Sequence, residues 1–208
     1  MQKKERREKA VCLISSGIDS PVAAYLMMKS YNIIFAHFLN YRDSETSKKV
    51  EKIIKALGKI SGKRHKLYLI EHYKTQEKIK SNCNTRYQCI LCKRAMYRAA
   101  EKIAEKENAK HIITGESLAQ VASQTLENMY VLDKAIKLVV LRPLIAFSKN
   151  ETINIAKKIG TYDISIEKEK PCPYLPKNPA TKSKTGIIES QEQRLGKFSL
   201  LIREVKEI

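Results

Sequence analysis

Short apolar runs alternate with amphipathic stretches along most of the chain. The apolar runs are nearly continuous rather than alternating, which is typical of strands buried on both faces of a parallel sheet. They predict strands at 10–14, 33–38, 67–70, 111–114 and 138–141. Between them, apolar residues recur at helical spacing and predict helices at 21–30, 45–60, 93–106, 118–128 and 150–159.

Strands that alternate with helices pair in parallel, because each crossover helix returns the chain to the same end of the sheet. We therefore expect an α/β fold with a doubly wound, mostly parallel five-stranded sheet and helices on both faces. In such folds a ligand binds beyond the carboxyl ends of the strands, where the strand order reverses. The turn after the first predicted strand lies at that edge.

Residues 170–208 lack the alternation of apolar strands and amphipathic helices seen in the rest of the chain. Residues 170–185, KPCPYLPKNPATKSKT, contain four prolines and no hydrophobic period, which predicts an ordered or gating loop. We expect residues 186–208 to form a helical tail. Because no Gly/Ser-rich linker divides the 208 residues, we expect a single domain over 1–208.

Composition narrows the class of protein. A hydrophobic content of 43% and a charged content of 30% are typical of a globular chain. No apolar run approaches the roughly 20 residues of a membrane span, and the charged N-terminus has no apolar signal core. These features predict a cytoplasmic protein with no membrane partner.

Positive charge is the strongest bulk feature. The 40 Lys and Arg residues exceed the 22 Asp and Glu residues and give a formal net charge of +18. Such an excess attracts polyanions, of which nucleic acid is the obvious candidate, although a well-solvated lysine-rich surface explains it equally well. The basic residues are densest at 3–9, 63–66 and 177–184.

A polar turn, SSGIDS at 15–20, follows the first predicted strand. Small residues let phosphate oxygens approach the backbone, Gly17 can take positive φ, and Ser15 and Ser20 supply hydroxyl donors. The carboxylate of Asp19 repels phosphate, so it is suited to hold Mg²⁺ or to orient the loop. The same residues also fit an ordinary turn in which Asp19 or Ser20 caps the next helix.

The chain has five cysteines, and an odd number without a secretion signal argues against a disulfide framework. Cys12 lies in the first apolar run, where we expect it to be a small buried hydrophobe. Cys89-Ile90-Leu91-Cys92 is a C-x-x-C motif, whose two thiolates can chelate a soft metal. Alone, the motif fits a redox pair, half of a zinc site or half of an iron–sulfur site.

The turn and its continuation, SSGIDSPVA, resemble the PP-loop S-G-G-x-D-S of ATP pyrophosphatases, which cleave ATP between the α and β phosphates. Three further motifs resemble those of tRNA 4-thiouridine synthetases: CKRAM at 92–96, GESLAQVASQTLEN at 115–128, and LRPL at 141–144 with Lys149 after it. The similarity to the catalytic domain of that family runs from about residue 10 to about residue 197. It implies the PP-loop ATPase fold, which is adenine nucleotide alpha hydrolase-like.

The resemblance implies an ATP-dependent tRNA sulfurtransferase. Members of the family adenylate a uridine carbonyl oxygen and displace AMP with sulfur, which gives 4-thiouridine. Catalytic roles are implied for Asp19, Lys149 and Cys172. The residues implied to bind ATP and its Mg²⁺ are Leu13, Ile14, Ser15, Gly17, Asp19, Ser20, His37, Phe38, Lys93, Gly115 and Gln124.

Backbone groups of Leu13, Ile14 and Phe38 are implied to hydrogen-bond the adenine edge. Simpler structural roles also fit several side chains outside the turn. His37 fits a core histidine. Gly115 fits a turn, Gln124 a polar helix face and Lys149 an exposed lysine.

Cys172 lies in KPCP, which resembles the loop that bears the family's catalytic cysteine. In many members this cysteine works with a persulfide-carrying rhodanese domain; none is recognisable here, so we expect sulfide or a separate sulfur donor. Cys89, Cys92 and Cys172 together resemble the three-cysteine pattern of cluster-dependent tRNA thiolases, found in archaeal members. Three thiolates hold a 4Fe-4S cluster and leave one iron open to exogenous sulfide. The alternative is structural zinc with Cys83 as fourth ligand.

Full-length relatives carry a THUMP-type RNA-binding module, which is not recognisable before the first predicted strand. We therefore expect tRNA to be held by the basic surface, by a homodimer or by a separate RNA-binding subunit. Two alternative functions remain open. One is a PP-loop enzyme that adenylates or thiolates another base or a small sulfur metabolite. The other is a non-catalytic nucleotide- or RNA-binding subunit, since Ser16 stands where the PP-loop usually has glycine.

Overall fold

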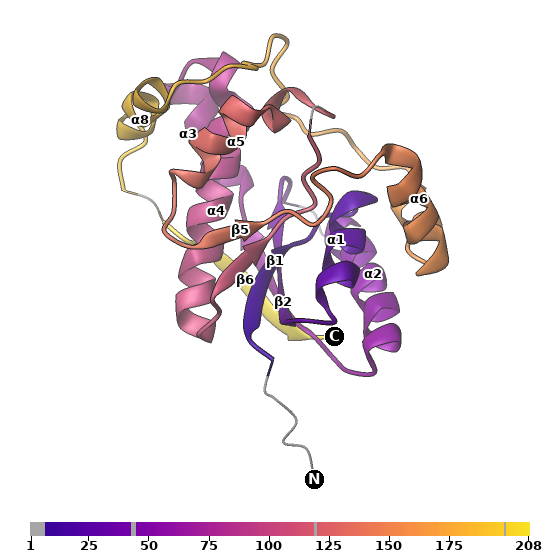
Figure 1. The fold of residues 1–208 in the computed structure, drawn as a ribbon. Helices are drawn as coiled ribbons and strands as arrows, with labels where there is room; N and C mark the ends of the chain where they lie inside the picture. The colour runs from indigo at the N-terminus through magenta and orange to yellow at the C-terminus, as the bar shows by residue number, and fades with distance from the viewer. Residues whose placement is uncertain (1–6, 43–44, 119, 198) are drawn as a thin grey trace.

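The computed structural model describes residues 7–42, 45–118, 120–197 and 199–208. Residues 1–6 of the N-terminal basic stretch and Ala119 of the 115–128 motif lie outside the described residues. Six strands form one sheet in the order β5-β4-β1-β2-β3-β6 (Figure 1). Their bounds are β1 Lys9–Leu13, β2 Asn32–Leu39, β3 Lys66–Glu71, β4 His111–Ile113, β5 Val139–Leu141 and β6 Ile202–Glu207.

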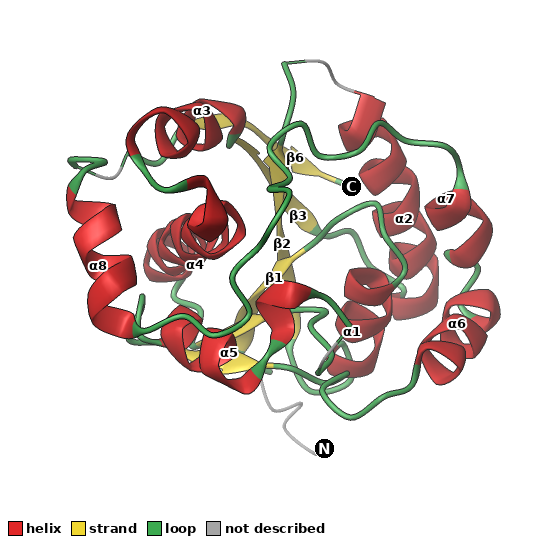
Figure 2. Cartoon of the chain, turned by 90° about the horizontal axis from the view of Figure 1, so that it is seen from above, coloured by secondary structure: helices red, strands yellow, loops and turns green. Residues whose placement is uncertain are grey.

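Helices cover both faces of the sheet. Figure 2 shows α1, α2, α6 and α7 on one side of the strands and α3, α4, α5 and α8 on the other. The α-helices are α1 Asp19–Met27, α2 Glu45–Ser61, α3 Tyr73–Asn82, α4 Gln88–Glu107, α5 Leu126–Asp133, α6 Lys149–Lys158, α7 Tyr162–Ile166 and α8 Thr185–Gln193. Two short 3₁₀ turns, η1 Thr85–Tyr87 and η2 Ala122–Gln124, complete the elements. No helix within the described ranges is long and apolar enough to cross a membrane.

The first strand is the topological centre of the fold. β1 pairs in parallel with β2 on one side and with β4 on the other, and β2–β3 and β4–β5 are also parallel. The chain therefore winds outward in both directions from β1, whose carboxyl end is the point where the strand order reverses. The predicted doubly wound, mostly parallel sheet with helices on both faces is confirmed.

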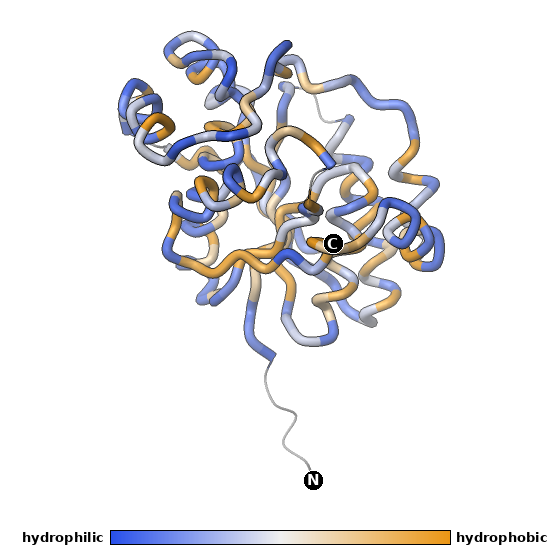
Figure 3. The backbone as a smooth tube through the Cα atoms, turned by 45° about the horizontal axis from the view of Figure 1, so that its top comes forward, coloured by the Kyte–Doolittle hydropathy of each residue, from blue (hydrophilic) through white to orange (hydrophobic). Residues whose placement is uncertain are grey.

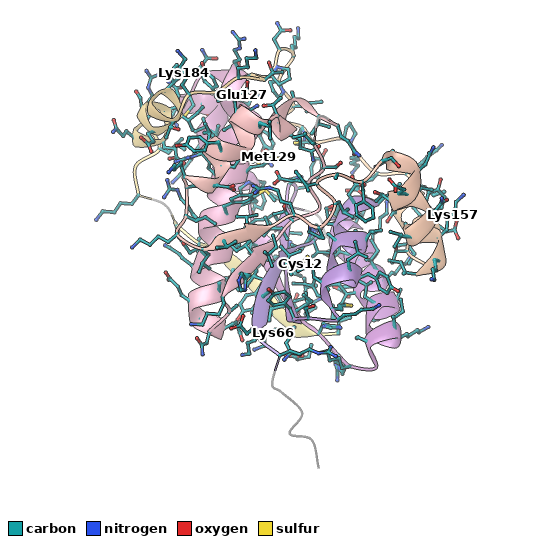
Figure 4. All side chains as sticks on the ribbon, viewed as in Figure 1. Cys12, Lys66, Glu127, Met129, Lys157 and Lys184 are labelled. Carbon is teal, nitrogen blue, oxygen red and sulfur yellow. The ribbon has the colours of Figure 1, made fainter. Side chains whose placement is uncertain are left out.

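Side chains of β1 alternate between two apolar cores, one on each face of the sheet. Val11 and Leu13 contribute to one core, whereas Ala10 and Cys12 contribute to the other. In Figure 3 the outermost segments are mostly hydrophilic, and Figure 4 places Cys12 in the middle of the molecule. Cys12 has no exposed surface, so its predicted role as a small buried hydrophobe is confirmed.

The five predicted strands are all present, but the predicted count of five was wrong because the sheet has a sixth strand, and the tail at 186–208 is helical only in its first part. Helix α8 ends at Gln193, and β6 then pairs antiparallel with β3 as a sixth strand. The six residues of β6, IREVKE, are mostly exposed and carry four charges, as suits the edge of a sheet. Such a segment lacks the hydrophobic period of a buried strand, and only its backbone pairing with β3 identifies it.

Among the helix boundaries that differ from the prediction, three affect the site. Residues 118–128 are not one helix: a loop containing η2 precedes α5, which begins at Leu126 with Thr125 as its cap. Helix α4 starts at Gln88 instead of residue 93, so the C-x-x-C motif lies in its first turn. Helix α6 starts at Lys149 with Ser148 as its cap, because Ser148 and Glu151 form a reciprocal capping box.

Candidate functional site

Two adjoining cavities lie beyond the carboxyl ends of β1, β2 and β4. The larger has a volume of about 640 Å³ and the smaller about 250 Å³. The loop after β1 separates them, and both are lined by Ile14, Ser15, Gly17, Lys93 and Met96. Each residue predicted to bind the nucleotide lines at least one of the two cavities. The fold thus brings together positions that lie far apart in the sequence.

The loop at 15–20 is closed by its own serines. Ser20 Oγ accepts a hydrogen bond from Ser15 N at 2.8 Å and lies 3.0 Å from Ser15 Oγ. Helix α1 begins at Asp19, and within the described chain no side-chain hydrogen bond caps it. The alternative in which Asp19 or Ser20 caps this helix was therefore wrong, because the Ser20 hydroxyl closes the loop instead. The positive end of the α1 dipole is left facing the smaller cavity.

Two glycines serve the loop in different ways. Gly17 does not use the positive φ that glycine allows; among the described glycines, only Gly62, Gly160 and Gly196 do so. Gly115 lies against the start of α1, where a Cβ atom would be 2.6 Å from Ser20 N and 2.8 Å from the carbonyl carbon of Asp19. Backbone atoms cannot move aside as a flexible side chain can. The segment after β4 can therefore support the loop only if residue 115 has no side chain.

Asp19 lines the smaller cavity and forms an ion pair with Lys149, which itself lines neither cavity. Lys149 Nζ lies 2.9 Å from Asp19 Oδ1, and both side chains keep part of their surface exposed. Lys149 is the first residue of α6, so the Ser148–Glu151 capping box holds its backbone in place. The pair joins two predicted catalytic residues that are 130 positions apart. A ligand that reaches Asp19 in this cavity also comes close to the ammonium group of Lys149.

Two buried polar atoms near the loop have no hydrogen-bond partner among the described residues: His37 Nε2 and Gln124 Oε1. Burial lowers the pKa of His37 despite its hydrogen bond to Ile14 O, so the imidazole is neutral. Since Nδ1 donates to Ile14 O at 2.9 Å, Nε2 is an unused acceptor. Unsatisfied buried acceptors are rare and favour a ligand that supplies donors.

Ile14 differs in part from its predicted role. Its N–H donates to Ala36 O at 3.0 Å, and its carbonyl accepts the His37 hydrogen bond. The N–H of Ile14 is therefore already used in the sheet and is not available to an adenine ring. Ile14 lines both cavities through its other atoms, as an apolar wall.

Glu116 is a buried carboxylate that was part of the GESLAQ motif but received no role from the sequence. It accepts hydrogen bonds from Lys93 Nζ at 2.7 Å, Tyr97 OH at 2.7 Å and Arg142 Nε at 2.9 Å. These partners come from α4 and from the segment after β5, so Glu116 joins three parts of the chain. The sequence signal that could have found Glu116 is its position just after a predicted buried strand, at the edge of the sheet where ligands bind.

Electrostatics keep Glu116 ionised. Burial alone would raise its pKa, but the charges of Lys93 and Arg142 and the hydrogen bonds of Lys93 and Tyr97 lower it to about 2. The carboxylate in turn holds the Lys93 ammonium at the boundary between the two cavities. Arg142 is also paired with Asp133 at 2.6 Å, which extends the charge network to the end of α5.

Two polar contacts hold the loops that cover the larger cavity. The side chain of Asn128 is fully buried and donates to Ala122 O at 2.7 Å and Ala180 O at 2.9 Å, which joins the η2 loop to the Pro-rich loop. Lys49, also buried, donates to the carbonyl oxygen of Glu167 at 2.8 Å, while Glu169 accepts from Ser16 Oγ. The sequence assigned no role to either contact.

Three cysteines open onto the larger cavity: Cys89 and Cys92 from the first turn of α4, and Cys172 from the Pro-rich loop. Burial raises the pKa of the Cys89 and Cys92 thiols, and the nearby Cys172 raises both further. Across the described chain, no group of three or more His, Cys, Asp or Glu side chains is arranged to hold a metal ion. The three cysteines thus share one cavity wall without forming a ready metal-ion site among the described residues.

His72 is a further neighbour of these thiols that the sequence did not indicate. Its Nε2 lies 3.1 Å from Cys92 Sγ, and burial lowers its pKa to about 4. A neutral imidazole next to a protonated thiol makes Nε2 the acceptor and Cys92 the donor. The contact orients the Cys92 sulfur within the cavity wall.

Cys83 does not join the other cysteines. Its thiol donates to Gln191 O at 3.3 Å and packs among apolar residues between α3, α4 and α8. It lines neither of the two cavities. A zinc site that uses Cys83 together with Cys89, Cys92 and Cys172 is therefore not supported by this arrangement.

Comparison with known proteins places these features in one family. The sequence profile of "Thiamine biosynthesis protein (ThiI)" matches residues 6–196. A "Probable tRNA sulfurtransferase" of Methanocaldococcus jannaschii is 42% identical over 193 residues, which cover 90% of this chain and 50% of the relative. A protein of the same name from Thermococcus kodakarensis is 45% identical over 176 residues, covering 82% and 46%. The chain spans about half the length of the curated relatives it matches.

A solved structure is similar to this chain over nearly its whole length. It is described as a 4-thiouridine synthetase–RNA complex with bound ATP. The TM-score is 0.90 at 36% sequence identity, and the match covers 97% of this chain and 55% of the other. The predicted PP-loop ATPase fold is confirmed.

The close contact at Gly115 predicts that a single added methyl group there lowers the stability of the protein. Gly115→Ala should lower the free energy of unfolding by about 1–3 kcal/mol, because the Cβ must displace backbone of α1. Gly186→Ala in α8, whose Cβ would meet nothing within 4 Å, is the control and should be neutral or slightly stabilising. Urea unfolding measures both; equal stability of the two variants would contradict the role given to Gly115.

The charge network predicts a pH-dependent stability. The pKa of Glu116 falls from 4.5 to about 2 on folding, so its contribution is present above pH 4.5 and is lost as the pH falls through 2. Such a shift corresponds to about 3 kcal/mol. Glu116→Gln should destabilise the protein by that order at pH 7, and the difference from the unchanged protein should shrink as the pH falls through this window. Glu105→Gln, an exposed position on α4, is the control. A pH-independent difference would contradict the assignment.

Proposed function

The chain belongs to the ThiI family, and we propose that it is the ATP-dependent catalytic part of a tRNA sulfurtransferase that makes 4-thiouridine. One observation carries the proposal: the loop at 15–20 lies between two cavities, one of which also holds the three cysteines. This arrangement suits a reaction in which a nucleotide is first cleaved and sulfur is then delivered on the other side of the same loop. The relatives named tRNA sulfurtransferases support the substrate class.

ATP would place its phosphates over the 15–20 loop and the start of α1. The open helix N-terminus, the hydroxyl groups of the loop and the close approach of Gly115 support this placement. The unused acceptors His37 Nε2 and Gln124 Oε1 suit the amino or hydroxyl groups of a nucleoside. Asp19 is the carboxylate best placed to hold Mg²⁺ against the phosphates, since Mg²⁺ is usually bound by one or two carboxylates plus substrate oxygens.

The chemistry needs activation before sulfur can enter. The uracil carbonyl oxygen attacks the α phosphorus of ATP, and pyrophosphate leaves with the electrons of the cleaved P–O bond. The adenylated oxygen is then a good leaving group, so attack of sulfur at the ring carbon expels AMP. Lys149 beside Asp19 would stabilise the negative charge that develops on the departing pyrophosphate.

The sulfur would enter from the side of the larger cavity, where Cys172 is exposed and Cys89 and Cys92 lie in the wall. We propose that these three cysteines bind a 4Fe-4S cluster. Three sulfur donors on one apolar cavity suit such a cluster, which when bound supplies an open iron position for a sulfide donor. The protein's own contribution is to keep that position inside a cavity shared with the nucleotide loop.

The proposal includes RNA binding, which the positive charge of the chain supports. The chain carries a formal net charge of +18, and Lys184 at the end of the Pro-rich loop lies at the end of the molecule opposite Lys66 (Figure 4). Because β3 begins at Lys66, the end with Lys184 is the one where the parallel strands terminate and the cavities open. Whether a homodimer or a separate subunit adds to this surface stays a prediction.

Exchange of labelled pyrophosphate into ATP tests the activation step. Lys149→Ala should lower the exchange rate by about 10²–10³-fold, because a positioned cation is lost from the charged transition state. Lys158→Ala, an exposed lysine of the same helix, is the matched control and should leave the rate unchanged. Equal rates in the two variants would contradict the role of Lys149.

The same assay separates the alternative functions. A requirement for tRNA is the result expected here. Exchange without tRNA would favour a small sulfur metabolite as substrate, and no exchange under either condition would favour a non-catalytic binding subunit.

Metal analysis tests the role of the cysteines. Protein purified without oxygen should contain about four iron atoms and four acid-labile sulfides per chain. Cys172→Ala and Cys89→Ala should lose them, whereas Cys83→Ala should keep them, because Cys83 lies outside the cavity. Stoichiometric zinc without iron, or a cluster that depends on Cys83, would contradict the assignment.

A further inference from the structure

A third cavity, of about 600 Å³, adjoins the cysteine-lined cavity on its outer side. Its walls come from the end of α3, from η1, from the start of α4 and from the Pro-rich loop. Four residues line both this cavity and the cysteine-lined one: Arg86, Gln88, Tyr174 and Leu175. A ligand group in the outer cavity is therefore separated from the cysteines by a single layer of side chains.

The lining of this outer cavity is basic. Lys80, Arg86 and Lys177 contribute three cationic side chains, and no carboxylate lies among the residues that line it. Within the described part of the chain, none of these three side chains has a hydrogen bond or an ion pair. Tyr174, in the wall shared with the cysteine-lined cavity, is hydrogen-bonded to the carboxylate of Glu77. Three unpaired cations around one cavity repel one another, and a bound anion would relieve that repulsion.

The position of Arg86 is set by the backbone. Its carbonyl accepts a hydrogen bond from Ala180 N at 3.0 Å, and its N–H donates to the side chain of Asn84 at 3.0 Å. η1 is thereby tied to the Pro-rich loop, so Arg86 and Lys177 approach the cavity from segments that are fastened together. The backbone of Arg86 is fixed in this way while its guanidinium stays unpaired, and a guanidinium suits the two-oxygen geometry of a phosphate group.

The phosphates of ATP are not suited to this cavity. None of the residues 15–20, which form the nucleotide loop, lines it, whereas several of them line the other two cavities. An anion bound here would belong to a second ligand. An enzyme that modifies a base must take the base out of its stack, and the attached ribose–phosphate then stays outside the reaction cavity.

We propose that the cavity lined by Lys80, Arg86 and Lys177 binds the phosphodiester of the RNA nucleotide whose base enters the cysteine-lined cavity. This inference rests on the proposed function, because it takes RNA as the second substrate. The ribose would pass the shared wall at Arg86 and Tyr174, with the base on the side of Cys172. The site then recognises backbone, so it holds any nucleotide equally and leaves the choice of base to the inner cavity.

Salt-dependent RNA binding tests the site. Lys80→Gln, Arg86→Gln and Lys177→Gln are each measured with an unmodified tRNA transcript over a range of salt concentrations. Each variant should bind several-fold more weakly at low salt and should lower the slope of log K against log salt by about 0.7–0.9, the loss of one phosphate contact. Lys55→Gln and Lys59→Gln, exposed lysines on α2 across the sheet, are the matched controls and should change the slope less.

Binding of ATP and of inorganic pyrophosphate, measured by calorimetry on the same variants, distinguishes the possible anions. Both affinities should stay unchanged, because the nucleotide loop is elsewhere. A parallel loss of pyrophosphate affinity, tRNA slopes equal to those of the controls, or no tRNA binding by the unchanged chain would each overturn the inference. If the unchanged chain binds ATP and tRNA normally and the three variants do too, this inference fails while the proposed function stands. If the unchanged chain does not bind ATP, the proposed function itself fails.

Discussion

Burial of the Glu116 carboxylate is the constraint around which this site is organised. A buried charge is tolerated only when it is paired, and here pairing requires Lys93 and Tyr97 from α4 together with Arg142 from beyond β5. The hydrogen bonds and ion pairs of Glu116 therefore hold α4 at a fixed distance from the carboxyl ends of β4 and β5. Lys93 is held where the two inner cavities meet as a direct consequence.

The neighbouring residue supplies the second half of the same constraint. Gly115 allows the segment after β4 to rest on the backbone of α1, and any side chain there would push the two apart. The 15–20 loop therefore packs against Gly115, which has no side chain, and is closed by the hydrogen bonds between Ser15 and Ser20. A preorganised loop of this kind meets a phosphate group without having to be ordered first.

Much of this arrangement could be predicted from the sequence, because parallel strands and crossover helices leave strong hydrophobic periods. The central strands and the switch point at β1 follow from that pattern, whereas the residues that line the nucleotide cavities were implied by the resemblance of their motifs to a known family. The rest depends on tertiary contacts with no local period: β6 is defined by pairing with β3, and the loop before α5 by the buried Asn128. The surroundings of the cysteines could not be predicted for the same reason. Packing places His72 beside Cys92 and leaves Cys83 apart, against Gln191.

The central claim is that the loop between the two inner cavities holds the phosphates of ATP. A crystal structure of this chain with a non-hydrolysable ATP analogue tests it most directly. The account predicts the triphosphate over residues 15–20 at the start of α1, with the nucleoside against His37 and Gln124. A triphosphate bound in the basic outer cavity, or an analogue that leaves both inner cavities empty, would contradict it.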